Sequence, residues 1–361
     1  MLLIHEKRTV FRMEADLKSQ DDNTLIVGPS WVGDMVMAQV LFILLKISHP
    51  KGKLSVLAPD WTRPVLNRMT QVDAVISLPF KHGDFQLRAR RDLGKSLRLN
   101  NYNRAIVLPN SFKSALVPFF AKIENRIGWR GEVRNLLLTD CRQLDKRKFP
   151  KMIHRFAALA LPSSAELPRE LPSPKLVVTQ GMIHNVLEKF KLEKYGPILA
   201  ICPGAEFGLS KQWPPHHFIS LCNSALKDGW YIWLFGSVSD VPVANEIFAG
   251  VKSEFQDRCV NFTGRTSLEE AVDLMAACSA VVSNDSGLMH VGAALDKPLI
   301  AFYGSSSPDF TPPLSEASTI LKTDIECRPC FKRVCPLGHG KCLSELLPAV
   351  AYSAVQSLEI L

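Results

Sequence analysis

The chain has 361 residues, with 43 Lys and Arg against 35 Asp and Glu, which gives a formal net charge of +8. Its hydrophobic content of 47% and charged content of 22% are ordinary for a globular protein and exclude a largely disordered chain. This length predicts two domains, each with its own core and sheet, with a cleft between them. The basic balance favours an anionic partner: nucleic acid, a phosphorylated sugar or an acidic membrane surface.

Basic residues gather in two stretches, at 81–98 and 126–134. Neither stretch is interleaved with several aromatic residues, as a single-strand-binding surface is, and the sequence has no nucleic-acid-binding motif. We therefore expect no nucleic-acid partner. An equally open interpretation of both stretches is that they are solvated helix faces.

The first residues of the chain indicate in which cellular compartment the protein is expected. Residues 1–22 lack the apolar core and the small-residue cleavage site of a secretory signal, so we expect a cytoplasmic protein with a poorly ordered N-terminal extension. The apolar stretch at 35–46 is shorter than the roughly 20 residues that cross a bilayer. It is interpreted as a buried helix.

Apolar strand patterns alternate with helical segments along the chain. In order, they begin at "NTLIV", "KLSVLAP", "VDAVISLP" and "NRAIVLP" and, after a Pro-rich passage at 161–175, at "PILAICP", "GWYIWLF", "CVNFTG", "SAVVSND" and "KPLIAFYG". This alternation predicts βαβ units and a mostly parallel sheet in each half. The Pro-rich passage is predicted to link a first domain at 23–172 to a second domain at 173–340. Residues 341–361 are expected to form a helical segment that packs back on either lobe.

The first βα turn, from Gly28 to Met35, has the glycine spacing of a phosphate-binding loop, but Asp34 stands where such a loop has Lys. A carboxylate there would repel a phosphate, and the Gly-x-Gly-x-x-Gly fingerprint of dinucleotide-binding folds is absent. An Asp at a helix start often serves as a cap or stabilises the helix dipole. The functional interpretation is an ionised general base, and the two roles are compatible.

A second Gly-rich loop carries Ser210 and Lys211 before a helix that we expect to begin at the pair Pro214 and Pro215. A lysine there can neutralise a diphosphate leaving group as the glycosyl bond breaks. The alternative interpretation is a solvated loop lysine.

A third loop carries Asp285, Ser286 and Gly287 at an expected helix start, with His290 one helical turn after Ser286. Free backbone N–H groups at a helix start attract anions, and a glycine permits close approach. The pattern favours a nucleotide diphosphate site. A capping Asp beside a buried, satisfied His is the alternative.

Nine cysteines do not make a disulfide scaffold in a chain of this size, and five of them are scattered as expected for reduced thiols. The other four are Cys327, Cys330, Cys335 and Cys342. Their first spacing is Cys-x2-Cys, but the later spacings depart from paired zinc knuckles. We favour a Pro/Gly-rich loop with reduced thiols, with a structural metal as the alternative.

Several of these motifs together resemble one family. "GPSWVGDM", "LPNSFKSAL", "RIGWRGEVR", "NDSGLMHVGAAL" and "CRPCFKRVCPLGHGKCL" are similar to the ADP-heptose:lipopolysaccharide heptosyltransferases of glycosyltransferase family 9, of the type that adds the second heptose. The resemblance runs from about Thr24 to the C-terminus. It implies a GT-B fold, an α/β architecture of two facing Rossmann-like domains, with acceptor bound by the first and ADP-heptose by the second. It also implies inverting transfer without a metal or other cofactor, and no Asp-x-Asp pair occurs in the chain.

The resemblance assigns roles to individual residues. Asp34 matches the family's proposed base, and Lys211 matches its diphosphate-binding lysine. Its nucleotide-sugar loop corresponds to Asp285, Ser286, Gly287 and His290, with Glu206 and Ser210 as further donor-binding candidates. For the acceptor, the candidates are Lys113, Arg126 and Arg130.

The implied reaction moves L-glycero-D-manno-heptose onto the first heptose of heptosyl-Kdo2-lipid A, with peripheral contact at the cytoplasmic face of the inner membrane. Two alternatives stay open. One is another GT-B enzyme, such as a heptosyltransferase of type I or a nucleotide-sugar epimerase. The other is a noncatalytic protein that binds lipopolysaccharide or nucleotide.

Overall fold

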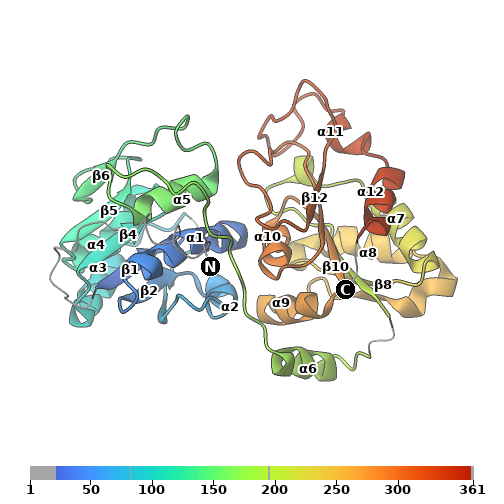
Figure 1. Ribbon diagram of the computed structural model, residues 1–361, viewed down its shortest axis with the longest axis horizontal. Coiled ribbons are helices and arrows are strands. Elements are labelled where there is room, and N and C mark those ends of the chain that lie inside the picture. The colour runs from blue at the N-terminus through green and yellow to red at the C-terminus, as the bar shows by residue number, and fades with distance from the viewer. Residues whose placement is uncertain (1–21, 82, 194–195, 359–361) are drawn as a thin grey trace, which may run out of the picture.

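The structure, a computed structural model, describes residues 22–81, 83–193 and 196–358. Two α/β lobes stand side by side (Figure 1). The expected N-terminal extension falls almost wholly on residues 1–21, which lie outside the described residues.

The first lobe is built on a parallel sheet of six strands in the order β3-β2-β1-β4-β5-β6. Its strands are β1 (Asn23–Val27), β2 (Lys53–Ala58), β3 (Ala74–Ser77), β4 (Arg104–Val107), β5 (Asn125–Trp129) and β6 (Asp140–Arg142). The central strands β1, β2 and β4 are almost entirely buried, as expected for apolar runs in a parallel sheet covered on both faces. The strand-and-helix alternation in the sequence is therefore confirmed.

Helices cover both faces of this sheet. They are α1 (Val32–Ser48), η2 (Asp60–Thr62), α2 (Arg63–Leu66), α3 (Leu87–Ser96), η3 (Leu97–Asn100), η4 (Phe112–Ala115), α4 (Leu116–Phe120) and α5 (Met152–Ala160). Helix α1 contains the long apolar stretch of the sequence and is buried along most of its length. No helix in the described ranges is long and apolar enough to cross a membrane.

The second lobe repeats the arrangement with six parallel strands in the order β12-β11-β10-β7-β8-β9. These strands are β7 (Ile198–Cys202), β8 (Tyr231–Leu234), β9 (Cys259–Asn261), β10 (Ala280–Asn284), β11 (Leu299–Phe302) and β12 (Ser318–Leu321). Every residue of β7, β10 and β11 is buried. Two doubly covered parallel sheets make this a GT-B fold, as predicted.

The helices of the second lobe include two that begin where the sequence predicts. These helices are α6 (Gln180–Lys189), η5 (Leu209–Lys211), α7 (Pro215–Lys227), η6 (Val238–Asp240), α8 (Val241–Ala249), η7 (Ser253–Arg258), α9 (Leu268–Ala277), α10 (Gly287–Ala294), α11 (Lys341–Ser344) and α12 (Pro348–Gln356). Helix α7 begins at its proline pair, and α10 begins directly after Ser286.

The connection between the lobes has no helix or strand from residue 161 to residue 179. The predicted domain boundary at 172/173 falls inside this segment, which passes between the two lobes to α6 (Figure 1). Helix α6 packs against α9, so it belongs to the second lobe. The last helix, α12, packs against α7 and β11, and the C-terminal segment thus adds to the second lobe.

The lobes touch through the amino ends of two helices. Helix α1 packs against α10, and glycines at both starts allow the approach. A Cβ atom on Gly33 would lie 2.8 Å from Cδ2 of His290, and a Cβ atom on Gly287 would lie 3.2 Å from Cβ of Val32. A larger residue at position 33 would therefore force the two lobes apart.

A buried ion pair joins the lobes beside this contact. Arg68, just after α2, donates from Nη2 and Nε to Oδ1 of Asp273 in α9, at 2.6 and 3.2 Å. The two side chains are only 1% and 10% exposed. The Arg68 carbonyl accepts from the N–H of Val177 in the connecting segment at 2.9 Å, so one residue holds three parts of the molecule together.

We expect Arg68→Ala to lower the free energy of unfolding by about 3–5 kcal/mol, because it leaves the Asp273 carboxylate buried without its partner. The measurement is chemical denaturation followed by circular dichroism. Arg91→Ala is the matched control: Arg91 pairs with Asp92 at the surface, where such pairs contribute about 0–1 kcal/mol. Equal destabilisation by the two variants would contradict a role for the buried pair.

Candidate active site

The predicted site residues follow the strands at the centre of each sheet. Asp34 lies in the first turn of α1, directly after β1, and Lys211 lies in the loop that follows β7. Asp285 and His290 follow β10, the neighbour of β7. In open parallel sheets, ligands bind at these carboxyl ends, and here the contact between α1 and α10 sets the two edges opposite each other.

The Asp34 carboxylate is kept partly out of water. Burial raises its pKa to about 6; the charge of Lys211 opposes this shift, and the charge of Asp285 adds to it. No hydrogen bond or ion pair engages its side chain in the described part of the chain. An unpartnered carboxylate with this pKa is a suitable general base near neutral pH.

Lys211 and Asp285 form the charged pair of the second lobe. Nζ of Lys211 lies 2.6 Å from Oδ2 of Asp285, and the side chains are 16% and 4% exposed. The ammonium group also stands 4.9 Å from the centre of the Phe207 ring. The cation is thereby fixed at the carboxyl end of the sheet, where it faces Asp34 of the other lobe.

His290 lies one turn into α10 and is 4% exposed. Burial lowers its pKa to about 4; the charge of Asp285 opposes this shift, and the charge of Lys211 adds to it. The imidazole is therefore neutral near pH 7. A neutral ring can donate or accept one hydrogen bond without adding charge to a site that already holds Lys211.

The amino ends of two helices add further positive potential to the site. The starts of α1 and α10 meet at Gly33 and Gly287, so the positive ends of both helix dipoles point into the same region as the Lys211 ammonium. Such a region binds an anion, above all a phosphate group. Chemically, the arrangement can accept a proton on one side and stabilise growing negative charge on the other.

The model of the family described as "Glycosyltransferase family 9 (heptosyltransferase)" matches residues 90–341, more than half of the chain. The chain belongs to glycosyltransferase family 9. It is therefore a glycosyltransferase, and the site above is the candidate active site of a family 9 enzyme.

Curated relatives and a solved structure agree with this family. The chain is 46% identical to lipopolysaccharide heptosyltransferase 2 of Salmonella typhimurium over 92% of this chain and 97% of that protein. It is 48% identical to lipopolysaccharide heptosyltransferase 2 of Escherichia coli K12 over 90% and 94%. The structure of E. coli ADP-heptose lps heptosyltransferase II superposes with a TM-score of 0.85 at 43% identity, and the match covers 93% and 98% of the two chains.

In this family 9 chain, the loop before α10 is organised by a residue that sequence reasoning did not select. Asn284, fully buried, accepts from the N–H of Trp213 at 3.0 Å and donates to the carbonyl of Pro203 at 2.7 Å. It thus fastens both ends of the Lys211 loop to β10. Ser286 occupies the N-cap position of α10, and its hydroxyl lies 3.3 Å from that of Ser283 and makes no capping hydrogen bond.

Two donor candidates point elsewhere. The Ser210 hydroxyl lies 2.9 Å from that of Ser305 and also donates to the carbonyl of Lys332, so it fastens the cysteine-bearing loop rather than facing Asp34. Glu206 is exposed and accepts from the Ser239 hydroxyl at 3.2 Å. Neither side chain is brought together with the pair of Lys211 and Asp285.

The three acceptor candidates are not equivalent. Lys113 lies half-buried in η4 after β4, and Arg130 is exposed just after β5, so both stand at the carboxyl edge of the first sheet. Arg126 is at the opposite end of β5. Its guanidinium donates to the carbonyls of Leu137, at 2.6 Å, and Ile123, which occupies it structurally.

Arg134 is the acceptor-side residue that the sequence did not single out. It is fully buried and donates to the carbonyls of Trp129 and Pro109, to the side chain of Asn110 at 3.0 Å and to the Ser114 hydroxyl at 3.2 Å. It therefore locks together the loops that follow β4 and β5. The only feature of the sequence that pointed to Arg134 was its place in the basic stretch at 126–134.

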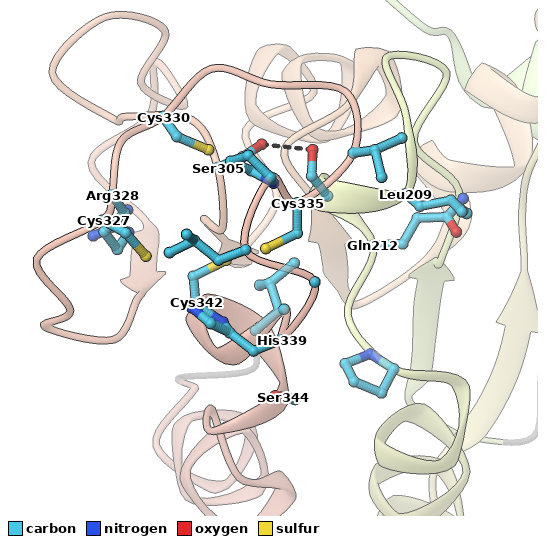
Figure 2. Close-up of a pocket in the computed structure, with 18 residues that line it drawn as sticks. Leu209, Gln212, Ser305, Cys327, Arg328, Cys330, Cys335, His339, Cys342 and Ser344 are labelled. Carbon is cyan, nitrogen blue, oxygen red and sulfur yellow. Dashed lines mark hydrogen bonds between the residues drawn. The ribbon is translucent and has the colours of Figure 1, made fainter.

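The four clustered cysteines line a cavity of about 300 Å³ beside the loop that carries Lys211. Figure 2 shows their side chains around this cavity, next to Ser305. None of the nine cysteines, all of which lie in the described ranges, is joined in a disulfide. Within the ranges the structure describes, no three His, Cys, Asp or Glu side chains are grouped so that they could hold a metal ion.

Proposed function

We propose that this enzyme transfers L-glycero-D-manno-heptose from ADP-heptose to the first heptose of heptosyl-Kdo2-lipid A, with inversion at the anomeric carbon. One observation carries the proposal: the desolvated, unpartnered carboxylate of Asp34 faces the pair of Lys211 and Asp285 across the contact between the lobes. The proteins named as heptosyltransferase 2, at 46% and 48% identity over nearly whole chains, support the choice of reaction.

The chemistry follows from the charges. Asp34 accepts the proton of the acceptor hydroxyl as its oxygen forms a bond to the anomeric carbon of the donor. The bond from that carbon to the diphosphate oxygen breaks, and ADP leaves with the electron pair. Lys211 and the amino end of α10 stabilise the charge that grows on the diphosphate. Because protein groups supply this positive charge, the proposed step needs neither a metal nor another cofactor.

For the acceptor, we assign anionic groups of the lipopolysaccharide inner core to Lys113 and Arg130 at the carboxyl edge of the first sheet. Arg134 holds the loops that carry them. Arg126 is left out of this assignment because its donors are already engaged by backbone carbonyls.

We also propose that the first lobe touches the cytoplasmic face of the inner membrane through α3. Arg88, Arg91 and Lys95 are exposed and spaced so that they share one side of this helix, with half-exposed Phe85 and Leu87 at its start. Each basic residue near an anionic lipid surface contributes about 1 kcal/mol. Co-sedimentation with anionic vesicles, but not with zwitterionic ones, tests this, and a triple Gln variant that binds as well as the native protein would refute it.

The test of the reaction is mass spectrometry of defined acceptors after incubation with ADP-heptose. We expect heptosyl-Kdo2-lipid A to gain one heptose and Kdo2-lipid A to gain none. Gain on Kdo2-lipid A alone would instead indicate a type I heptosyltransferase. Conversion of ADP-heptose without acceptor would indicate an epimerase, and ADP binding without transfer would indicate a noncatalytic protein.

A further inference from the structure

The tryptophans of this chain fall into two groups. Four of the six are buried, none more than 7% exposed: Trp129, Trp213, Trp230 and Trp233. The other two, Trp31 and Trp61, are 48% and 49% exposed. Large apolar side chains left half in water are informative when they gather at one place, because burying an indole is strongly favourable.

Both exposed tryptophans stand beside the proposed base. Trp31 occupies the N-cap position of α1, three residues before Asp34. Trp61 lies in η2, just after the neighbouring strand β2, and its indole N–H donates to the carbonyl of Ser30 at 2.8 Å. The hydrogen bond fixes Trp61 against the residue that precedes Trp31, so both indoles lie at the carboxyl edge from which Asp34 emerges.

The rings have free faces. Neither indole makes a ring–ring or cation–ring contact with another described residue. The one polar atom of the Trp61 ring is already satisfied within the protein. What remains available is apolar ring surface beside a carboxylate, with the Trp61 ring held by its hydrogen bond. Such a surface suits an amphipathic partner with C–H groups on one face and hydroxyls at its rim. A pyranose sugar has this chemistry.

We propose that Trp31 and Trp61 form the platform that binds the acceptor sugar and directs its hydroxyl at Asp34. The proposal rests on the heptosyl transfer proposed above and deepens it. It makes the two tryptophans determinants of acceptor affinity and specificity, distinct from the donor-binding groups of the second lobe. In this arrangement Lys113 and Arg130 contact only the anionic substituents of the acceptor, and the indoles bind the sugar ring.

Substitution of these tryptophans should weaken binding of the acceptor without weakening binding of the donor nucleotide. Trp31→Ala and Trp61→Ala should each raise the KM for heptosyl-Kdo2-lipid A by about tenfold or more, because an apolar contact of this size is worth at least about 1.4 kcal/mol. The Kd for ADP should stay within about twofold. Trp31→Phe and Trp61→Phe keep a ring and should be milder than the Ala variants. Val350→Ala is the matched control, since Val350 is also 48% exposed but lies on α12 of the second lobe.

Intrinsic fluorescence provides a readout that does not depend on turnover. Saturating acceptor without donor should shift the emission of the native protein to shorter wavelength, because it covers the exposed indoles. The Trp31→Phe/Trp61→Phe variant should show no such shift while its melting temperature stays near the native value.

Two results would overturn the platform: Ala variants that fold and keep the native KM for acceptor, or an acceptor-induced emission shift that persists in the double Phe variant. If the native protein binds acceptor with the emission shift but transfers no heptose, the proposed reaction fails and the platform stands.

Discussion

Asp34→Asn is expected to lower the turnover of heptose transfer by about 10²–10⁴-fold, because the variant cannot accept the proton of the acceptor hydroxyl. The Kd for ADP should change little, since the proposed nucleotide pocket belongs to the second lobe. Steady-state kinetics with ADP-heptose and acceptor, together with calorimetric titration of ADP, measure the two quantities. Native turnover in a folded Asp34→Asn protein would remove Asp34 from the mechanism.

The same variant should be more stable than the native enzyme. Folding raises the pKa of Asp34 from 3.8 to about 6, so the folded state prefers the protonated acid. The stabilisation by that preference is present below pH 3.8 and is lost as the pH rises through 6. At pH 7 the ionised carboxylate therefore costs on the order of 2–3 kcal/mol, which Asn does not. Denaturation of both proteins at pH 4 and pH 7 should show the gain only at pH 7.

Lys211→Ala is expected to reduce transfer by about 10²–10³-fold and to weaken binding of ADP, because the diphosphate loses the cation that stabilises it. The measurements are turnover and ADP titration. Lys211 is held 2.6 Å from Asp285, so its removal also leaves a carboxylate that is only 4% exposed without a partner. The variant should accordingly unfold at a lower denaturant concentration.

Lys227→Ala controls for the loss of one positive charge, since Lys227 is exposed in the last turn of α7. It should leave turnover, ADP affinity and stability unchanged. The donor pocket would have to be placed elsewhere if Lys211→Ala bound ADP with native affinity.

Much of the fold could be predicted because its signals are local. Apolar runs at 23–27 and 280–284, each followed by a helical pattern, are sufficient to indicate buried parallel strands at the centre of each sheet. The charged residues at the ends of such strands, Asp34 and Asp285, could be selected for the same reason, because parallel strands bring their carboxyl ends to one edge.

The features that the sequence did not predict depend on contacts between residues far apart in the chain. Arg68 meets Asp273 across 205 positions, and nothing near either residue indicates the other. Arg134 looked like any other residue of a basic stretch, yet it is fully buried and its donors are engaged inside the protein. Exposure separates Trp31 and Trp61 from the other four tryptophans, and exposure cannot be read from a residue type that is usually buried in part.

The most direct test of Asp34 as the general base opposite Lys211 is the pH dependence of kcat/KM for transfer, measured from pH 5 to pH 8. This ratio reports ionisation in the free enzyme. His290 has a pKa of about 4 and stays neutral across this range, so we expect kcat/KM to rise through a single pKa near 6 and then level off. In Asp34→Asn, the residual rate should lose this inflection. A flat profile in the native enzyme, or the same inflection in the variant, would contradict Asp34 as the base.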